Sequence, residues 1–298
     1  MTEQSDSNEQ GDQVRPVAFI GLGMMGASIA DKLVDWPGGL RVCDVNPDAL
    51  TPFTDKGATG FASAGEAARG AAVVSIVVLN DQQVRSVVED ILASRGESDA
   101  PQVIAIHSTI HPQTAIDLAE LCAAQGVLLV DAPVSGGAVA AKEGRLAVMI
   151  GGTDEAFAAV SEPFGTFAEL VIHAGPVGSG TKMKLARNLL HFISFTAVTE
   201  SQRLAEAAGV SLVDLGKVVR HTDSISGGAG AIMLRDTTAP IAPDDFWHGV
   251  FTHVRNLGEK DLSLALALGD ELAVGLPLTA LAYDNLGIGL GVGAGHDE

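Results

Sequence analysis

Long apolar runs are missing from this chain of 298 residues, although 47% of its residues are hydrophobic. A helix that crosses a membrane needs about 20 consecutive apolar residues, so the sequence predicts no transmembrane segment. The first 13 residues, MTEQSDSNEQGDQ, are polar and acidic and lack the apolar stretch of a signal peptide. We therefore expect a disordered tail over residues 1–13 and a cytoplasmic location.

Basic residues are scarce. The chain has 18 Lys and Arg residues against 37 Asp and Glu residues, which gives a formal net charge of −19 at pH 7. A surface of this charge repels nucleic acid and anionic membranes, so neither is an expected partner. It also repels an anionic substrate at long range, so a site for a carboxylate has to gather positive charge locally.

Metal-binding patterns are missing as well. Cys43 and Cys122 are far apart and outside any metal-ligand spacing, so we expect both to be small buried hydrophobic residues. No histidine has a context such as HExxH, and the sequence predicts no metal site. The histidines of the chain include His107, His191, His221, His248 and His253.

The chain is rich in glycine, with 35 residues, and in short β-branched runs. From Val14 to about Ala174 these runs alternate with longer Ala-rich stretches of helical character. This alternation predicts βαβ units and a mainly parallel sheet, and continuous apolar strands fit a sheet covered on both faces. The predicted strands are VAFI (17–20), LRVCD (40–44), VVSIVVL (73–79), VIAIH (103–107), VLLVD (127–131), LAVMIGG (146–152) and LVIHA (170–174).

The second half of the chain has a different pattern. After Pro176 the β-branched runs stop, and residues 178–209 are typical of one long helix that ends at Gly209. About four further helical stretches follow, up to Gly291. We therefore expect an α/β domain over residues 14–176 and an all-α domain over residues 177–298, joined by the long helix.

The first predicted strand runs directly into a glycine-rich turn, Gly21-Leu22-Gly23-Met24-Met25-Gly26. A GxGxxG that follows a strand and opens a helix is the fingerprint of a Rossmann-type, doubly wound parallel sheet that binds a dinucleotide. Gly21 permits the tight turn, Gly23 lets the pyrophosphate approach the backbone, and Gly26 lets helix and strand pack closely. All six residues are predicted to contact the cofactor.

An acidic residue ends the second predicted strand. Asp44 lies 18 residues beyond Gly26, where a carboxylate accepts hydrogen bonds from the adenosine ribose. Asp44 would repel a 2′-phosphate, and no Arg follows it directly, so NAD is predicted and NADP is less favoured. The alternative is a turn-forming Asp ahead of Asn46-Pro47.

Four separated motifs give the chain a resemblance to a known family. They are FIGLGMMGASIADKL, DAPVSGGAVAAKEGRLAVMIGG (131–152), GSGTKMKLARN (178–188) and EKDLSLAL (259–266). With these motifs in this order the chain resembles the β-hydroxyacid dehydrogenases, the group of 3-hydroxyisobutyrate dehydrogenase and tartronate semialdehyde reductase. The resemblance implies an NAD-dependent oxidoreductase that interconverts a small 3-hydroxy acid and its semialdehyde.

The substrate residues are expected in the two middle motifs. Ser135-Gly136-Gly137 offers a hydroxyl and backbone N–H groups, which suits a carboxylate, although the residues alone also fit an ordinary glycine turn. Lys184 and Asn188 lie four apart on one face of the long helix. Taken alone, Lys184 would be a solvated surface lysine, but the resemblance implies that it is the catalytic general acid and base, with Asn188 beside it. Burial near Lys182, Arg187 and Lys260 would lower the pKa of Lys184.

Four further residues are predicted to contact the cofactor. Leu79 and Asn80 follow a strand and would lie along the cofactor through their backbone. Thr109 would bond the nicotinamide ribose, or cap the helix after Pro112. The resemblance places Lys260 near cofactor and substrate, and the alternative is a surface ion pair with a neighbouring acid.

Some residues depart from the family pattern. Ala140 replaces a glycine, Arg187 replaces an asparagine, and His253 stands where Phe is usual. Arg187 could anchor a second carboxylate or a phosphate, or face solvent. Two alternatives stay open: an imine reductase, which typically has Asp or Tyr in place of Lys184, and a non-catalytic NAD-binding protein. The resemblance also implies a homodimer or homotetramer.

Overall fold

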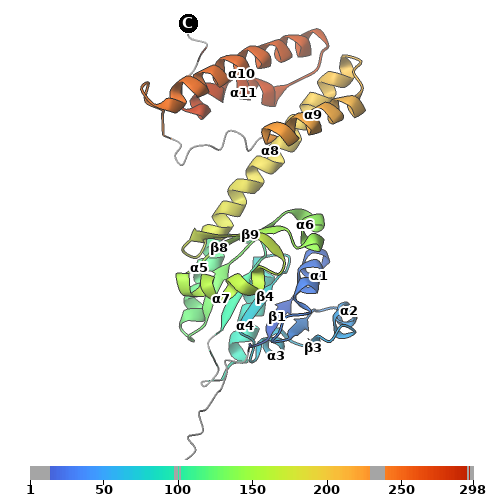
Figure 1. The fold of residues 1–298 in the computed structure, drawn as a ribbon, viewed down its shortest axis with the longest axis vertical. Coiled ribbons are helices and arrows are strands. Elements are labelled where there is room, and N and C mark those ends of the chain that lie inside the picture. The colour runs from blue at the N-terminus through green and yellow to red at the C-terminus, as the bar shows by residue number, and fades with distance from the viewer. Residues whose placement is uncertain (1–13, 97–99, 101, 229–238, 294, 296–298) are drawn as a thin grey trace, which may run out of the picture. The chain divides into compact units, whose positions relative to one another are not determined.

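The structure is a computed structural model, and it describes residues 14–96, 100, 102–228, 239–293 and 295 (Figure 1). The tail expected over residues 1–13 lies outside the described residues. The chain divides into two compact units, Met1–Asn188 and Leu189–Glu298, and each is described by itself. The domain boundary at residue 176 rests on composition and stays a prediction.

The first unit is built on a sheet with the strand order β3-β2-β1-β4-β5-β6-β8-β7, and β9 pairs with β8. The strands from β3 to β6 are parallel, β8 is antiparallel to β6 and β7, and β9 is parallel to β8. The strands are β1 (Val17–Ile20), β2 (Leu40–Cys43), β3 (Thr59–Phe61), β4 (Val73–Ile76), β5 (Val103–Ile106), β6 (Leu128–Asp131), β7 (Val134–Ser135), β8 (Leu146–Gly151) and β9 (Ala168–Gly175). This confirms the predicted doubly wound, mainly parallel sheet.

Two strands were not predicted. β3 has three residues and β7 has two, too few to show an alternating or continuous apolar pattern. β7 changes the description of Ser135, which was expected in a loop. Ser135 lies on this short strand and pairs with Ala147 of β8.

The sheet is covered by helices on both faces, which explains its apolar strands. In β1, Val17 and Phe19 face one core while Ala18 and Ile20 face the other, as the period of two requires. The first core also holds side chains of α1 (Met24–Ala30), α6 (Gly137–Glu143) and α7 (Asp154–Phe164). The second core holds side chains of α3 (Ala64–Ala68), α4 (Asp81–Ala93) and α5 (Pro112–Ala123). A short helix, α2 (Thr51–Thr54), leads into β3.

Both cysteines are free and lie in the second core. Burial raises the pKa of Cys43 to about 11 and that of Cys122 to about 12. Both thiols therefore stay protonated and unreactive at neutral pH. This confirms the expectation that they act as small buried hydrophobic residues.

The long helix expected over residues 178–209 is α8 (Ser179–Ala207), whose first turns belong to the first unit. In the described residues that follow there are three more helices, α9 (Leu212–Ser226), α10 (Phe246–Glu271) and α11 (Pro277–Leu290). The N-terminus of α11 is capped by Glu200 of α8, which accepts hydrogen bonds from the N–H groups of Leu278 (2.8 Å) and Thr279 (3.0 Å). In the part of the chain that the structure describes, none of the helices has the length and apolar character that a membrane crossing requires.

Candidate active site

The glycine-rich turn lies between β1 and α1, where the strand order reverses. Gly21 has φ +93°, and a Cβ there would overlap the carbonyl oxygen of Val77. A Cβ on Gly26 would overlap the carbonyl oxygen of Gly21, so helix and strand touch at this point. Gly23 differs, because a Cβ there would meet nothing within 4 Å. Two glycines are thus required by the turn, and the third borders open space.

That open space belongs to a cavity of about 670 Å³ at the carboxyl ends of β1, β2 and β4. Such crevices at the switch point of an open α/β sheet hold nucleotides. Among the predicted cofactor residues the cavity is lined by Gly21, Gly23, Asp44 and Leu79. Its volume, its glycine edge and a carboxylate at the end of β2 fit the adenosine side of a dinucleotide.

Asp44 is held in place by two backbone groups. Its Oδ2 accepts from the N–H of Leu22 (2.5 Å), and its Oδ1 accepts from the N–H of Asn46 (2.8 Å). The bond with Asn46 gives Asp44 the turn-forming role that the sequence offered as the alternative. Because each carboxylate oxygen has two lone pairs, both oxygens can still accept a ribose hydroxyl. Asp44 thus joins the glycine-rich turn to the end of β2 and also faces the cavity.

The segment after β4 is fixed by side chains of its neighbours. Leu79 is exposed, and its N–H donates to Oε1 of Gln83 (2.8 Å). The side chain of Asn80 caps α4 by accepting from the N–H of Gln83 (2.9 Å). The cap uses one lone pair of the Asn80 side-chain oxygen. The backbone contact of Asn80 with the cofactor stays a prediction.

The segment after β5 contains Thr109, which is exposed and does not line the cavity. The alternative role of Thr109 as a helix cap is wrong, because His111 caps α5 through its Nδ1, which accepts from the N–H of Gln113 (3.2 Å). The sequence did not identify His111 as the cap of α5, because Thr is a common capping residue and His a rare one.

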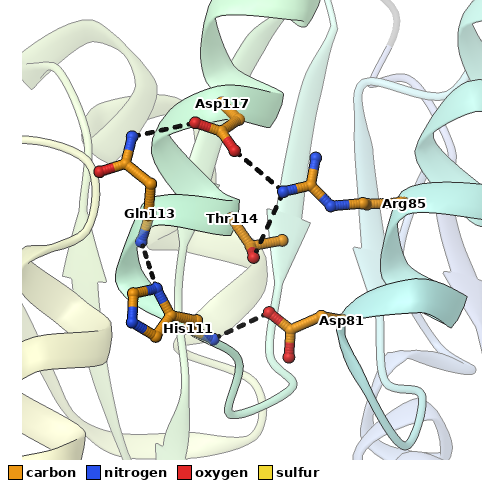
Figure 2. A network of polar contacts seen from close by, with 6 residues as sticks. All are labelled: Asp81, Arg85, His111, Gln113, Thr114 and Asp117. Carbon is orange, nitrogen blue, oxygen red and sulfur yellow. Dashed lines mark hydrogen bonds and ion pairs between the residues drawn. The ribbon is translucent and has the colours of Figure 1, made fainter.

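A polar network joins the first turns of α4 and α5 (Figure 2). Oδ1 of Asp81 accepts from the N–H of His111 (3.0 Å), and Arg85 donates to Oδ2 of Asp117 (2.9 Å). Gln113 donates to the other oxygen of Asp117 (2.9 Å). The network holds together the two helices that follow the segments carrying Leu79 and Thr109. Sequence reasoning missed it because its members are ordinary polar residues of helix starts.

The Ser-Gly-Gly segment forms a tight turn. Gly136 has φ +134° and Gly137 has φ +71°, both in the region that favours glycine. A Cβ on Gly136 would also lie 2.6 Å from the Cβ of Ala140, the residue that departs from the family pattern. The turn opens α6, which packs against α1. The predicted carboxylate-binding turn and the glycine-rich turn are therefore carried by neighbouring helices (Figure 1).

Lys184 lies near the start of α8 and is partly buried. Burial, and then the charge of Arg187, lower the pKa of Lys184. The direction and the role of Arg187 agree with the sequence prediction. Nη1 of Arg187 also donates to Oδ1 of Asn188 (3.3 Å), which leaves the amide N–H₂ of Asn188 for another partner.

Lys260, a predicted cofactor contact, and His253, which departs from the family pattern, both lie on α10 in the second unit. Both are exposed there. The expected position of Lys260 beside cofactor and substrate joins residues of both units and stays a prediction.

Two buried polar residues at strand ends make contacts that the sequence did not predict. Asp131, at the end of β6, accepts from backbone N–H groups at the start of α8. His107, after β5, is buried against Phe19, Phe164 and Phe167, and burial lowers its pKa to about 4. Its Nδ1–H donates to the carbonyl oxygen of Ala132 (2.8 Å) and its Nε2 faces the Ser75 hydroxyl (3.0 Å). A position directly at or after a strand end was the available signal for both.

Comparisons with known proteins agree with the fold and with the family that the motifs resemble. Residues 16–175 match the NAD binding domain of 6-phosphogluconate dehydrogenase, and residues 178–296 match the NAD-binding domain of NADP-dependent 3-hydroxyisobutyrate dehydrogenase. An uncharacterized oxidoreductase of Mycobacterium tuberculosis is 55% identical over 276 residues, with 93% of each chain covered. The 3-hydroxyisobutyrate dehydrogenase of Pseudomonas aeruginosa is 34% identical over 286 residues, with 94% of each chain covered.

Solved structures give the same picture. A crystal structure of an oxidoreductase from Mycobacterium avium superimposes with a TM-score of 0.88 at 50% identity, covering 93% of this chain and 98% of that one. The fold and the matches together define an NAD(P)-dependent dehydrogenase that acts on CH–OH groups. The chain belongs to the β-hydroxyacid dehydrogenase family, as its four motifs indicated.

Imine reductases share this fold. One from Pseudomonas sp. superimposes with a TM-score of 0.68 at 21% identity. At that identity the likeness shows the fold alone. The relatives above 30% identity named here include a 3-hydroxyisobutyrate dehydrogenase, which favours carbonyl chemistry over imine chemistry.

Proposed function

We propose that this enzyme uses NAD to interconvert a small 3-hydroxy acid and its semialdehyde, with Lys184 as the general acid and base. The observation that carries the proposal is a partly buried lysine with a lowered pKa, placed on the helix of the third family motif. The similarity to the 3-hydroxyisobutyrate dehydrogenase of P. aeruginosa supports the substrate class.

The cofactor would be held by the turn Gly21-Leu22-Gly23-Met24-Met25-Gly26 and by the residues around the cavity. Asp44 would accept hydrogen bonds from the adenosine ribose, and its charge would repel a 2′-phosphate, which favours NAD over NADP. The remaining contacts would come from Leu79, Asn80, Thr109 and Lys260. The bound nicotinamide supplies or accepts the hydride.

The substrate carboxylate would bind at Ser135-Gly136-Gly137. The Ser135 hydroxyl and the N–H groups of the turn can donate to an anion, which the net charge of −19 otherwise repels. The amide N–H₂ of Asn188 would donate to the substrate, since its oxygen accepts from Arg187. These contacts would orient the reacting carbon.

Proton transfer would take place at Nζ of Lys184. In the oxidation direction a neutral Lys184 takes the proton of the hydroxyl group. In the reduction direction the ammonium group donates a proton to the carbonyl oxygen as negative charge develops there. For oxidation, a lowered pKa raises the share of neutral Lys184 near neutral pH. For reduction, it makes the ammonium group a stronger acid.

Turnover of a panel of acids tests this proposal. NADH formation is measured by absorbance with NAD and with NADP, for 3-hydroxyisobutyrate, serine, threonine, glycerate, 4-hydroxybutyrate and 3-phenylserine, and a cyclic imine is tested for reduction. We expect one hydroxy acid to turn over with NAD. Lys184→Ala should lower kcat by about a hundredfold or more, while Kd for NADH stays within about twofold.

Lys182→Ala is the matched control, because Lys182 is exposed two residues away on the same helix. Lys182 was expected to help lower the pKa of Lys184, but burial and Arg187 are the causes in the structure, so Lys182→Ala should leave kcat unchanged. Substantial turnover by Lys184→Ala would contradict the role of Lys184. Turnover of the imine alone would contradict the substrate class.

We further propose that the enzyme is a homodimer or homotetramer. Among the described residues of the second unit, Ile241, Phe251 and Leu290 form a small buried core. By contrast Val213, Val218 and Ile225 of α9 are all more than half exposed. Association would cover such side chains. Light scattering after size exclusion tests this, and a monomer at micromolar concentration would contradict it.

A further inference from the structure

Asp131 is the last residue of β6 and is fully buried. Its Oδ1 accepts from the N–H of Gly178 (2.6 Å) and its Oδ2 from the N–H of Thr181 (2.6 Å). Each oxygen thus binds a free N–H group at the start of α8, where the helix dipole also favours negative charge. Burial raises the pKa of the Asp131 carboxyl, and the hydrogen bonds from Thr181 and Gly178 oppose this rise because they favour the ionised form. In the ionised form these bonds are charge-assisted and about twice as strong as neutral ones.

The joint between Asp131 and α8 has no spare room. A Cβ on Gly151 of β8 would overlap Oδ1 of Asp131, and Gly151 is the residue that pairs with Asp131 in the sheet. A Cβ on Gly180 of α8 would overlap the carbonyl oxygens of Met149 and Asp131. Two glycines therefore let a strand and a helix start close around one carboxylate. The start of α8 therefore packs directly on β6 and β8.

The two chain segments that meet at Asp131 each carry part of the proposed substrate site. Ser135 follows Asp131 by four residues, and Lys184 follows Thr181 by three. The end of β6 is also held from the other side, because Ala132 donates its N–H to the carbonyl oxygen of Ile106 (2.8 Å) and accepts from His107 (2.8 Å). Asp131 thus connects a fixed strand end, which leads to the carboxylate-binding turn, to the helix that bears the lysine.

We infer that Asp131 is a positioning residue of this enzyme, which holds Lys184 in register with the turn Ser135-Gly136-Gly137 by anchoring the start of α8. The inference rests on the proposed function of Lys184. Asp131 acts through α8 and not on the substrate, because it is fully buried and both its carboxylate oxygens accept backbone N–H groups of that helix start. When its carboxylate is removed, the N–H groups of Gly178 and Thr181 lose their acceptors and the first turn of α8 loosens. Lys184 then becomes more exposed, and its amine titrates closer to the ordinary value of a lysine.

The test compares Asp131→Asn and Asp131→Ala with the wild-type enzyme. Asn keeps the shape and one acceptor oxygen, and Ala keeps neither. Thr153→Ala is the control, because Thr153 caps α7 in the same unit with an ordinary cap bond from the N–H of Ala156 (3.2 Å). For each protein we would measure kcat, KM and Kd for NADH. We would also measure amide hydrogen exchange at residues 178–184 and the titration of Lys184 by NMR with ¹³C-labelled lysine.

We expect kcat to fall about tenfold in Asp131→Asn and about a hundredfold in Asp131→Ala, with Kd for NADH within about twofold. Amide exchange at the start of α8 should become faster, and the pKa of Lys184 should rise by up to about one unit. Thr153→Ala should change none of these. Asp131→Asn should retain part of the kcat that Asp131→Ala loses.

The inference is overturned if the Lys184 titration is the same in wild type and variants, or if kcat and NADH affinity fall by the same factor, as in general unfolding. Turnover by Lys184→Ala would overturn the proposed function instead, and the Lys184 titration in Asp131→Asn would still decide the inference. Where Asp131→Ala does not fold, Asp131→Asn preserves the volume of the joint and carries the test.

Discussion

Ser108 makes two hydrogen bonds with the backbone of a single residue, Val78. Its hydroxyl donates to the carbonyl oxygen of Val78 (2.7 Å) and accepts from the N–H of Val78 (2.8 Å). This pair ties the segment after β5 to the segment after β4, and Val78 lines the cavity. The shape of the cavity wall therefore depends on a side chain that does not line it.

Ser108→Ala should weaken NADH binding. Without the hydroxyl the N–H and the carbonyl of Val78 lose their partner, which costs about 1–3 kcal/mol in stability and loosens the cavity wall. We expect Kd for NADH to rise about three- to tenfold, measured by quenching of protein fluorescence. Ser161→Ala is the control, because Ser161 bonds only within α7. An unchanged Kd in Ser108→Ala would show that the pair does not shape the cavity.

Asp44→Ala should reduce the preference for NAD. The variant loses the ribose acceptor and the charge that repels a 2′-phosphate, so the ratio of kcat/KM for NAD over NADP should fall about tenfold or more. The N–H groups of Leu22 and Asn46 also lose their acceptor, so some stability is lost. Asp48→Ala, on the exposed turn that follows, is the control. A ratio that stays at the wild-type value would remove Asp44 from the ribose site.

Arg187→Asn, which introduces the usual residue of the family, should shift the pH profile. The charge of Arg187 contributes to the lowered pKa of Lys184, so its removal raises that pKa. Oxidation needs neutral Lys184, and its rate is lost as the pH falls through this pKa. The acid limb of kcat against pH should therefore move to higher pH, by up to about one unit.

The control for this shift is Arg145→Asn, a change of the same type at an exposed site paired with Glu143 and Glu169. It should leave the profile unchanged. The same panel of acids shows whether Arg187 also selects a second anionic group. An acid limb that does not move in Arg187→Asn would exclude the electrostatic role.

His107 should make the protein less stable in mild acid. Its pKa is about 4 in the folded chain, because burial disfavours the charged ring, and about 6.5 when unfolded. Above the unfolded pKa both states are neutral. As the pH falls from about 6.5 towards 4, His107 becomes protonated in the unfolded chain but stays neutral in the folded chain. The free energy of unfolding therefore falls by roughly 3 kcal/mol in total.

Urea unfolding at several pH values measures this effect. Between about pH 6.5 and 5 the wild type should lose about 2 kcal/mol more than His107→Gln, which keeps a donor and an acceptor but does not titrate. The variant should be the less stable of the two at pH 7.5, since its amide does not fill the space among three phenylalanine rings. If the free energy of unfolding fell with pH equally in both proteins, His107 would not be the residue with the lowered pKa that causes the loss of stability.

Much of the fold follows from local patterns. Strands buried on both faces have to be continuous apolar runs, so VAFI, VVSIVVL and VIAIH predicted β1, β4 and β5, although the last two runs extend past the ends of their strands. The glycine-rich turn was equally readable, because its geometry excludes side chains at Gly21 and Gly26. β3 and β7 escaped prediction because they are too short to show a pattern. Ser135 was therefore expected in a loop, while pairing with β8 makes it part of the sheet.

The sequence by itself determined the class of fold, the order of its main elements and the glycine-rich turn, since each depends on residues close together in the chain. The role of Lys184 is a proposal, which the motif around it suggests and its partial burial supports. Only the tertiary structure decided what holds these parts in place. The carboxylate of Asp131 meets N–H groups 47 and 50 residues further along the chain, and Ser108 meets Val78 across 30 residues. Such contacts leave no local pattern, because an Asp or a Ser at a strand end has the same composition whichever backbone group it later binds.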